Sequence, residues 1–153
     1  MNAIFGVNAN NGFGIGNTMP WDRSKEDMVR FRKYTTNNIV LMGKNTWLSD
    51  MPKPLPNRRN TVLSNSLNDD RCEVYRDINS FLSSVEDTNK VWVIGGISVL
   101  WHMRPYITNI YLSEFHCSKN ADVYIDTQEY LKGFELINKE FYTDHTFKIY
   151  KKI

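Results

Sequence analysis

The sequence has few cysteines, no long apolar run and no cluster of positive charge. Its two cysteines, Cys72 and Cys117, lack the spacing of metal ligands, so we expect neither a bound metal nor a disulfide. No stretch approaches the roughly 20 apolar residues that a membrane-spanning helix needs. The N-terminus lacks the basic and apolar regions of a signal peptide. We therefore expect a cytoplasmic protein with no membrane partner.

The charged residues are balanced in sign and dispersed along the chain. Lys and Arg number 19 and Asp and Glu number 17, which gives a net charge of +2. Nucleic-acid-binding proteins usually carry clustered basic residues, so we expect no nucleic-acid partner. The 153 residues, 41% hydrophobic and 24% charged, are typical of one globular domain with a sizeable core. No repeat or linker divides residues 1–153, and we expect a single domain.

Alternating β-rich runs and short helical patterns predict an α/β fold with a central, mixed, mostly parallel sheet. Strands are expected over 3–8, 38–42, 60–64, 90–94, 107–115, 134–142 and 146–151, and about four helices over 24–34, 44–49, 77–85 and 96–103. Continuous apolar runs at 39–42 and 91–94 predict strands buried on both faces near the sheet centre. No helical pattern separates the last two strands, which predicts an antiparallel C-terminal hairpin.

A carboxylate lies on the expected apolar face of the first helix. Asp27 shares this face with Met28 and Phe31, because residues three and four apart stack on one side of a helix. The run from Ser24 to Asp27 also fits a capping box, in which Ser24 caps the helix and Asp27 reaches back. A desolvated carboxylate can instead serve a ligand that needs an anion or a proton donor. Spacing alone leaves both interpretations open.

Three strand ends carry residues that suit a phosphate. Gly95-Gly96 and Gly43-Lys44 each precede a predicted helix, whose free N–H groups favour an anion, and Ser64-Asn65-Ser66 offers hydroxyls at the end of a third strand. Ligands collect at the carboxyl ends of parallel strands, so these sites together suit a dinucleotide with an extra phosphate. Simple turns and a solvated lysine are the alternatives. The run 12–16 lacks the context of a dinucleotide fingerprint, and we interpret it as a mobile glycine loop that covers a ligand.

Seven short motifs follow one another along the chain: Gly12-Phe13-Gly14, Met19-Pro20-Trp21, Asp27-Met28 with Phe31, Met42-Gly43-Lys44-Asn45-Thr46-Trp47, Pro54-Leu55-Pro56-Asn57-Arg58, Val93-Ile94-Gly95-Gly96 and Tyr111-Leu112-Ser113. Their order and spacing resemble the dihydrofolate reductase family, and an aspartate at position 27 resembles its bacterial and bacteriophage branch. The resemblance implies a three-layer fold and NADPH-dependent reduction of 7,8-dihydrofolate to 5,6,7,8-tetrahydrofolate. Such an enzyme supports one-carbon metabolism and thymidylate and purine synthesis.

The resemblance also implies a substrate site. Asp27 would hold the pterin N–H groups and assist protonation, Ser113 would brace the carboxylate, and Trp21 would order a nearby water. The residues that would line the pterin and benzoyl slot are Ile4, Phe5, Gly6, Met28, Phe31, Leu55 and Ile94. Arg58 would clamp the carboxylate of the glutamate tail with its planar fork. The alternative for Arg58 is a surface cation, and Gly6 departs from the alanine that is usual in the family.

For NADPH, the resemblance implies contacts along the same strand ends. The residues near the nicotinamide would be Gly6, Phe13, Gly14 and Met19; those near the pyrophosphate would be Gly43, Lys44, Asn45, Thr46, Gly95, Gly96, Ile97, Ser98 and Val99; and those near the 2′-phosphate would be Lys44, Leu63, Ser64 and Asn65. Residues 9–23 would form a lid that excludes water.

We expect a monomer that acts on a small molecule. Two other hypotheses fit the sequence, because a fold does not determine a substrate. The first is a related pterin or pyrimidine reductase of the same fold. The second is a structural protein that binds NADPH without turnover.

Overall fold

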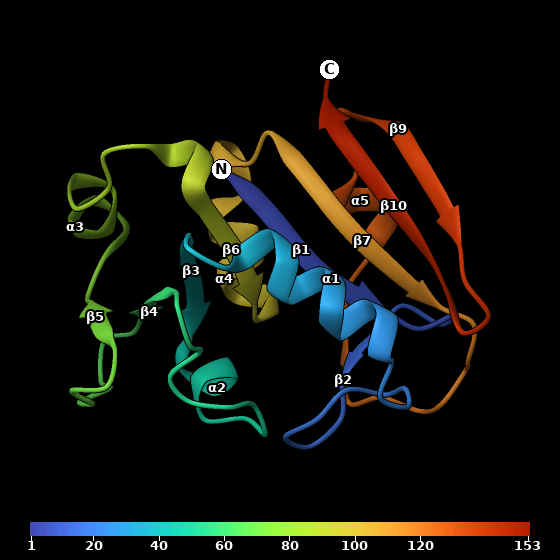
Figure 1. The fold of residues 1–153 in the computed structure, drawn as a ribbon, viewed down its shortest axis with the longest axis horizontal. Helices are drawn as coiled ribbons and strands as arrows, with labels where there is room; N and C mark the ends of the chain where they lie inside the picture. The colour runs from blue at the N-terminus through green and yellow to red at the C-terminus, as the bar shows by residue number, and fades with distance from the viewer.

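An eight-stranded sheet crosses the whole molecule in the computed structural model, which describes residues 1–153 (Figure 1). Its order is β5-β4-β3-β6-β1-β7-β10-β9. The strands are β1 (Asn2–Val7), β3 (Ile39–Gly43), β4 (Arg59–Leu63), β5 (Glu73–Tyr75), β6 (Val91–Gly95), β7 (Asn109–Phe115), β9 (Phe134–Phe141) and β10 (His145–Lys152). All neighbours from β5 to β7 are parallel, whereas β10 is antiparallel to both β7 and β9. The predicted mixed sheet and C-terminal hairpin are therefore confirmed.

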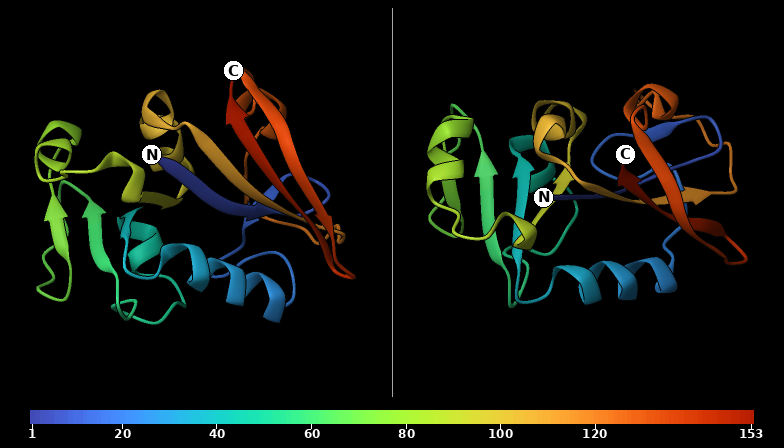
Figure 2. Two further views of the ribbon diagram at one scale, coloured as in Figure 1. Left: turned by 45° about the horizontal axis from the view of Figure 1, so that its top comes forward. Right: turned by 90° about the horizontal axis from the view of Figure 1, so that it is seen from above.

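Helices cover both faces of this sheet. The helices are α1 (Lys25–Thr35), α2 (Lys44–Trp47), α3 (Ile78–Ser83), α4 (Ile97–Met103) and α5 (Thr127–Tyr130), with two 3-10 turns at Thr88–Lys90 and Arg104–Tyr106. Seen along the sheet, α1 lies on one side and α3, α4 and α5 lie on the other (Figure 2). None of the helices is both long and apolar enough to cross a membrane.

The sequence analysis missed α5, so its expectation of about four helices was one short. This helix has four residues and is capped by Asp126, whose side chain accepts a hydrogen bond from Glu129 N at 3.1 Å. A single turn offers no apolar periodicity to detect. The other caps follow the usual rules: Asp77 caps α3, and α4 ends at Met103, before Pro105.

Two apolar clusters lie on opposite faces of the sheet, since successive strand residues point to opposite sides. In β6, Val91 and Val93 belong to the cluster beneath α3, α4 and α5, whereas Trp92 and Ile94 belong to the cluster beneath α1 and α2. β3 alternates in the same way. Both strands occupy the middle of the sheet, as their continuous apolar runs predicted.

The glycine-rich run 12–16, predicted as a loop, contains a short strand. Gly12–Gly14 forms β2, which pairs with β8 (Val123–Tyr124) in a separate two-stranded sheet. The partner strand lies more than a hundred residues away along the chain, so no local pattern reports the pairing. The prediction of a loop was therefore wrong for residues 12–14.

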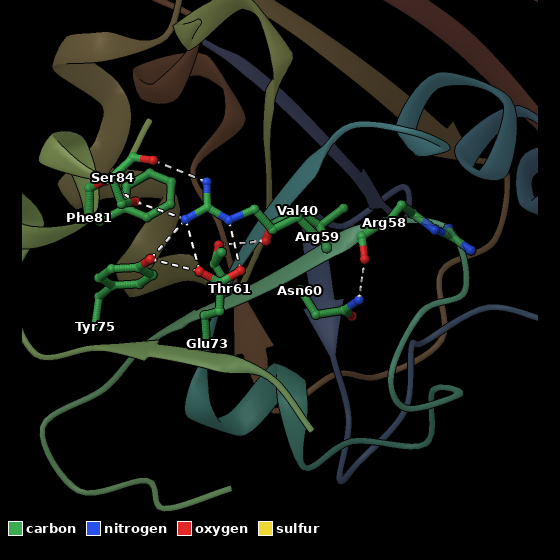
Figure 3. Close-up of polar contacts among 9 residues, drawn as sticks. All are labelled: Val40, Arg58, Arg59, Asn60, Thr61, Glu73, Tyr75, Phe81 and Ser84. Atoms are coloured by element: carbon green, nitrogen blue, oxygen red, sulfur yellow. Dashed lines mark hydrogen bonds and ion pairs between the residues drawn. The ribbon is translucent and has the colours of Figure 1, made fainter. Parts of the chain in front are cut away.

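Two consecutive arginines on β4 and the preceding turn point in opposite directions (Figure 3). Arg59 pairs with Glu73 at 2.7 Å and also donates to the Tyr75 hydroxyl at 2.8 Å, which ties β5 to β4. Arg58 points away from this cluster, toward α1. The turn before β4 is fixed by buried Asn60, which bonds both backbone polar groups of Leu55 and the carbonyl of Arg58, each at 2.9 Å.

Replacing Asn60 with alanine should therefore destabilise the protein by about 2–4 kcal/mol, because buried backbone groups lose their partners. Urea denaturation followed by circular dichroism measures the loss. Asn79→Ala, at an exposed position on α3, is the matched control, with an expected change within about 0.5 kcal/mol. Equal stabilities of the two variants would contradict the assigned role of Asn60.

Candidate active site

Asp27 lies in the first turn of α1, and its carboxylate points toward β7 of the sheet. Its Oδ1 accepts a hydrogen bond from Ser113 Oγ at 2.6 Å and lies 3.4 Å from Arg30 Nη1. Ser24 Oγ accepts from Asp27 N at 3.4 Å, so Ser24 caps the helix as the capping box predicts. The carboxylate does not reach back to Ser24. Ser24 alone therefore caps α1. The Asp27 side chain, which is 27% exposed, is available for another role.

Trp21 and Gly6 lie beside this carboxylate. Gly6 is opposite Ser113 in the register of β1 and β7. The buried ring of Trp21 stacks on Phe115 with 4.5 Å between ring centres. A Cβ on Gly6 would lie 2.9 Å from Trp21 Cζ2 and 3.2 Å from Phe115 Cε2. The tight approach of Trp21 accounts for glycine where the family pattern has alanine.

Four of the apolar residues expected to line the substrate slot meet in one cluster, beneath α1. These residues are Ile4, Phe31, Leu55 and Ile94. Phe5 points to the opposite face of β1, where it contacts Phe13 with 6.1 Å between ring centres. Met28 is 42% exposed and its sulfur lies 3.0 Å from Arg23 Nε. The structure therefore does not bring the side chains of Phe5 and Met28 into this cluster.

Arg58 lies at the C-terminal end of α1 and has no carboxylate partner. It donates to Pro56 O at 2.9 Å and to Thr35 Oγ1 at 3.1 Å, and its guanidinium lies 6.0 Å from the ring centre of Phe31. Partial burial lowers the pKa of Arg58, and the nearby Arg32 guanidinium acts in the same direction. Arg59, in contrast, has its pKa raised, chiefly by the hydrogen bond to Glu73. Arg59 is thus a structural cation, whereas Arg58 is available to an incoming anion.

The glycine-rich ends of β3 and β6 lie side by side. A Cβ on Gly43 would lie 3.0 Å from Val99 Cγ2, and one on Gly95 would lie 3.4 Å from Thr46 Oγ1 and 3.3 Å from Phe13 Cζ. Gly95 has φ of +135°, which favours glycine, and the Gly95-Gly96 peptide bond is cis. Five residues that the sequence analysis placed near NADPH therefore converge, and the missing side chains allow Val99, Thr46 and Phe13 to approach the backbone closely.

A cationic, hydroxyl-rich group lies at the end of β4. Lys44 Nζ donates to Ser66 Oγ at 3.0 Å, and Ser64 Oγ accepts from the backbone N–H groups of Ser66 and Leu67. Arg76 donates to Ser64 O at 3.0 Å. The sequence analysis included Ser66 in the hydroxyl-bearing run at this strand end but missed Arg76. Ser66 extends a run of polar residues that is visible in the sequence. No local pattern signals Arg76, which directly follows β5.

The predicted lid, residues 9–23, is tied to residues that follow β7. Asn8 Oδ1 accepts from Gly12 N at 2.8 Å, and Asn8 Nδ2 donates to Lys119 O at 2.8 Å. Gly16 N donates to Asp122 Oδ2 at 2.9 Å. Met19 is 52% exposed at the outer part of this segment. Asn8 and Asp122, which hold the predicted lid, were not among the predicted site residues, because the contacts of Asn8 with Lys119 and of Asp122 with Gly16 join residues far apart in the chain.

The chain matches the family model described as dihydrofolate reductase over residues 1–152. Dihydrofolate reductase type A10 of Escherichia coli is 34% identical over 136 residues, which cover 83% of this chain and 68% of that protein. Dihydrofolate reductase type 8 of the same organism is 29% identical and covers 99% of this chain and 95% of that protein. Among solved structures, dihydrofolate reductase from Enterococcus faecalis complexed with NADP(H) and RAB-propyl superimposes with a TM-score of 0.84, at 22% identity, over 99% of this chain and 95% of that chain.

The mostly parallel sheet, with the Asp27 carboxylate and the glycine-rich strand ends along one edge, is the arrangement of an α/β enzyme that binds its ligands at the carboxyl ends of the strands. The chain belongs to the dihydrofolate reductase family. The predicted family, fold class and enzyme class, an oxidoreductase that acts on a CH–NH group, are thereby confirmed.

The close approach of Trp21 to Gly6 generates a prediction. Gly6→Ala should destabilise the protein by about 1–3 kcal/mol, because the added methyl overpacks against two aromatic rings. Urea denaturation measures this difference. Gly14→Ala is the matched control, since a Cβ there would meet its nearest atom at 3.7 Å. If Gly6→Ala proved as stable as the wild type, the packing explanation for this glycine would be wrong.

Proposed function

We propose that this chain reduces 7,8-dihydrofolate to 5,6,7,8-tetrahydrofolate with NADPH, and that Asp27 is the residue that binds the pterin and assists its protonation. The observation that carries the assignment of Asp27 is its hydrogen bond from Ser113 at 2.6 Å, which aims the carboxylate at the carboxyl ends of β1 and β7. Oδ2 accepts no hydrogen bond from the protein, so it is free to accept from the amino and ring N–H groups of a pterin.

Ser113 and Trp21 prepare the carboxylate for this role. Ser113 holds Oδ1 in place, so that Asp27 does not rotate when the substrate binds. Trp21, fixed by stacking on Phe115, walls the site and orders the water that delivers the proton. The cluster that contains Ile4, Leu55 and Phe31 supplies an apolar wall for the flat pterin and the benzoyl ring.

Arg58 binds the carboxylate of the glutamate tail. Three observations support this role: the guanidinium is partly buried, it lacks a carboxylate partner, and it lies near Phe31 on the cluster that receives the benzoyl ring. A planar guanidinium matches a carboxylate with two parallel hydrogen bonds. Its placement argues for a substrate with an acidic tail over other pterins or pyrimidines.

NADPH, when bound, supplies the hydride. The residues that would hold it fit the group, because Gly43 and Gly96 begin α2 and α4 without a side-chain cap, which leaves N–H groups at these helix starts for a phosphate. Lys44, with Ser64, Ser66 and Arg76 beside it, offers cations and hydroxyls to a 2′-phosphate, which favours NADPH over NADH. Phe13 contacts Phe5 and approaches Gly95, so it lies where the lid meets the cofactor.

The same proposal covers the setting in which the enzyme works. The residues assigned above lie on or beside one eight-stranded sheet, and none of the proposed roles calls for a residue from a second copy, which favours a single-domain monomer. The substrate and the cofactor are small intracellular molecules, which supports a cytoplasmic enzyme rather than a partner of nucleic acid or membrane.

Asp27→Asn should lower turnover by at least about 100-fold, because a neutral amide cannot assist proton delivery. The loss should be largest at neutral and alkaline pH, where the solvent supplies few protons. NADPH oxidation with dihydrofolate, recorded beside a thermal melt of each protein, measures this effect. Full activity of a folded Asp27→Asn variant would remove the basis for the assigned role, and a wild type that binds NADPH without oxidising it would indicate a protein without turnover.

Arg58→Ala should raise KM for dihydrofolate about 10- to 100-fold with a smaller change in kcat, because the charge-assisted bonds to the tail are lost. Arg58→Lys is the matched control: it keeps the charge but not the planar fork, so its KM should be intermediate. Steady-state kinetics at saturating NADPH measure both constants. An unchanged KM in Arg58→Ala would favour a substrate without a glutamate tail.

A further inference from the structure

Arg30 carries a buried positive charge next to Asp27, and no step above uses it. Its side chain is 9% exposed, with Nη1 3.4 Å from Asp27 Oδ1. The guanidinium carbon lies 4.1 Å from the ring centre of Phe147 and 4.7 Å from that of Tyr142. Aromatic faces attract a cation, but a buried charge also needs a polar partner.

That partner is His145, which is fully buried at the start of β10. Its Nε2 lies 3.0 Å from Arg30 Nη1, and its Nδ1 lies 2.6 Å from Asp144 Oδ1. A guanidinium only donates hydrogen bonds, so Nε2 must be the acceptor and carries no proton. The imidazole is therefore neutral, with its proton on Nδ1 and donated to Asp144. Stacking against Phe115 and Tyr142 fixes the plane of the ring.

The result is a chain of contacts from Asp144 through His145 and Arg30 to Asp27. Both Ser113 and Arg30 approach the same oxygen of Asp27, Oδ1, which leaves Oδ2 free. We propose that Arg30, oriented by His145, is a positioning residue for Asp27 that holds Oδ1 on the protein side and stabilises the carboxylate as an anion. This inference rests on the proposed function, because it assumes that Asp27 acts in the reaction.

The surrounding charges are few. The charged and titratable groups that face Arg30 and His145 are Asp27 from α1 and Tyr142 and Asp144 from the turn before β10, whereas β7 presents the neutral Ser113 and Phe115. Burial alone would raise the pKa of Asp144, but hydrogen bonds from His145 and Ser24 outweigh it and lower the pKa. Asp144 is thus an anion that keeps the His145 proton on Nδ1.

Arg30→Met tests the proposal, since methionine fills the space between Tyr142 and Phe147 without charge. Removing the positive charge of Arg30 favours the protonated forms of the groups beside it, Asp27 among them. Turnover should therefore persist to higher pH. The pH at which kcat/KM falls to half its plateau should rise by roughly one unit. The plateau of kcat should also fall, because Oδ1 loses one of its two partners, whereas KM for NADPH should stay unchanged.

Two variants of His145 separate positioning from packing. His145→Phe keeps the stack with Phe115 and Tyr142 but removes both nitrogens, so its pH profile should move in the same direction as that of Arg30→Met. His145→Gln restores an acceptor for Arg30 and a donor for Asp144, and its profile should return toward that of the wild type. Equal profiles for His145→Phe and His145→Gln would reduce His145 to a packing residue and overturn its part of the proposal.

Arg71→Gln is the charge-matched control, because Arg71 is 54% exposed and pairs with Asp69 on the surface. Its profile should superimpose on that of the wild type. If Asp27→Asn is inactive but the Arg30→Met profile is unshifted, or shifts no more than that of Arg71→Gln, the positioning role is wrong and the proposed function stands. If Asp27→Asn is fully active, the proposed function itself is wrong.

Discussion

The parallel pairing of β1 with both β6 and β7 is the constraint on which the site depends. Because β3 and β4 run in the same direction, the carboxyl ends of five strands meet along one edge of the sheet. Gly43 and Gly95 are the last residues of β3 and β6, and Ser113 lies near the end of β7. Ser64 directly follows β4. A carboxylate, two glycine-rich strand ends and a hydroxyl-rich group, which are distant in the sequence, thus lie along one edge of the sheet.

The sequence predicted the elements whose burial is local. The runs 39–42 and 91–94 are apolar at every position because β3 and β6 are covered on both faces, so composition alone identified them and their place. The strands β5 and β8 were not predicted, because each has at most three residues and depends on a partner. β5, for example, is held by the ion pair from Arg59 to Glu73, which no local pattern reveals.

The sequence predicted the position and contacts of some site residues correctly and only the backbone position of others. The capping box left Asp27 ambiguous, and only its distance to Ser113 separates the cap, which is Ser24, from the carboxylate. Motif order brought Asp27 and Ser113 together before any geometry was known. Met28 belongs to one of these motifs and Phe5 was assigned through the resemblance, but helix exposure and strand alternation direct their side chains elsewhere. A motif thus specifies backbone position better than it specifies what a side chain contacts.

Arg30 illustrates what neither composition nor motif order could supply. In the sequence it belongs to a charged helical run and has the pattern of a solvated cation. Its burial depends on Tyr142, His145 and Phe147, which arrive with the C-terminal hairpin. Buried ion pairs are weak evidence for stability, since apolar residues of similar size often pack as well. The slot between two aromatic rings would accept such a residue, so stability alone does not account for a charge there. The proposed effect of Arg30 on Asp27 accounts for the charge, because Asp27 is the residue to which we assign the chemistry.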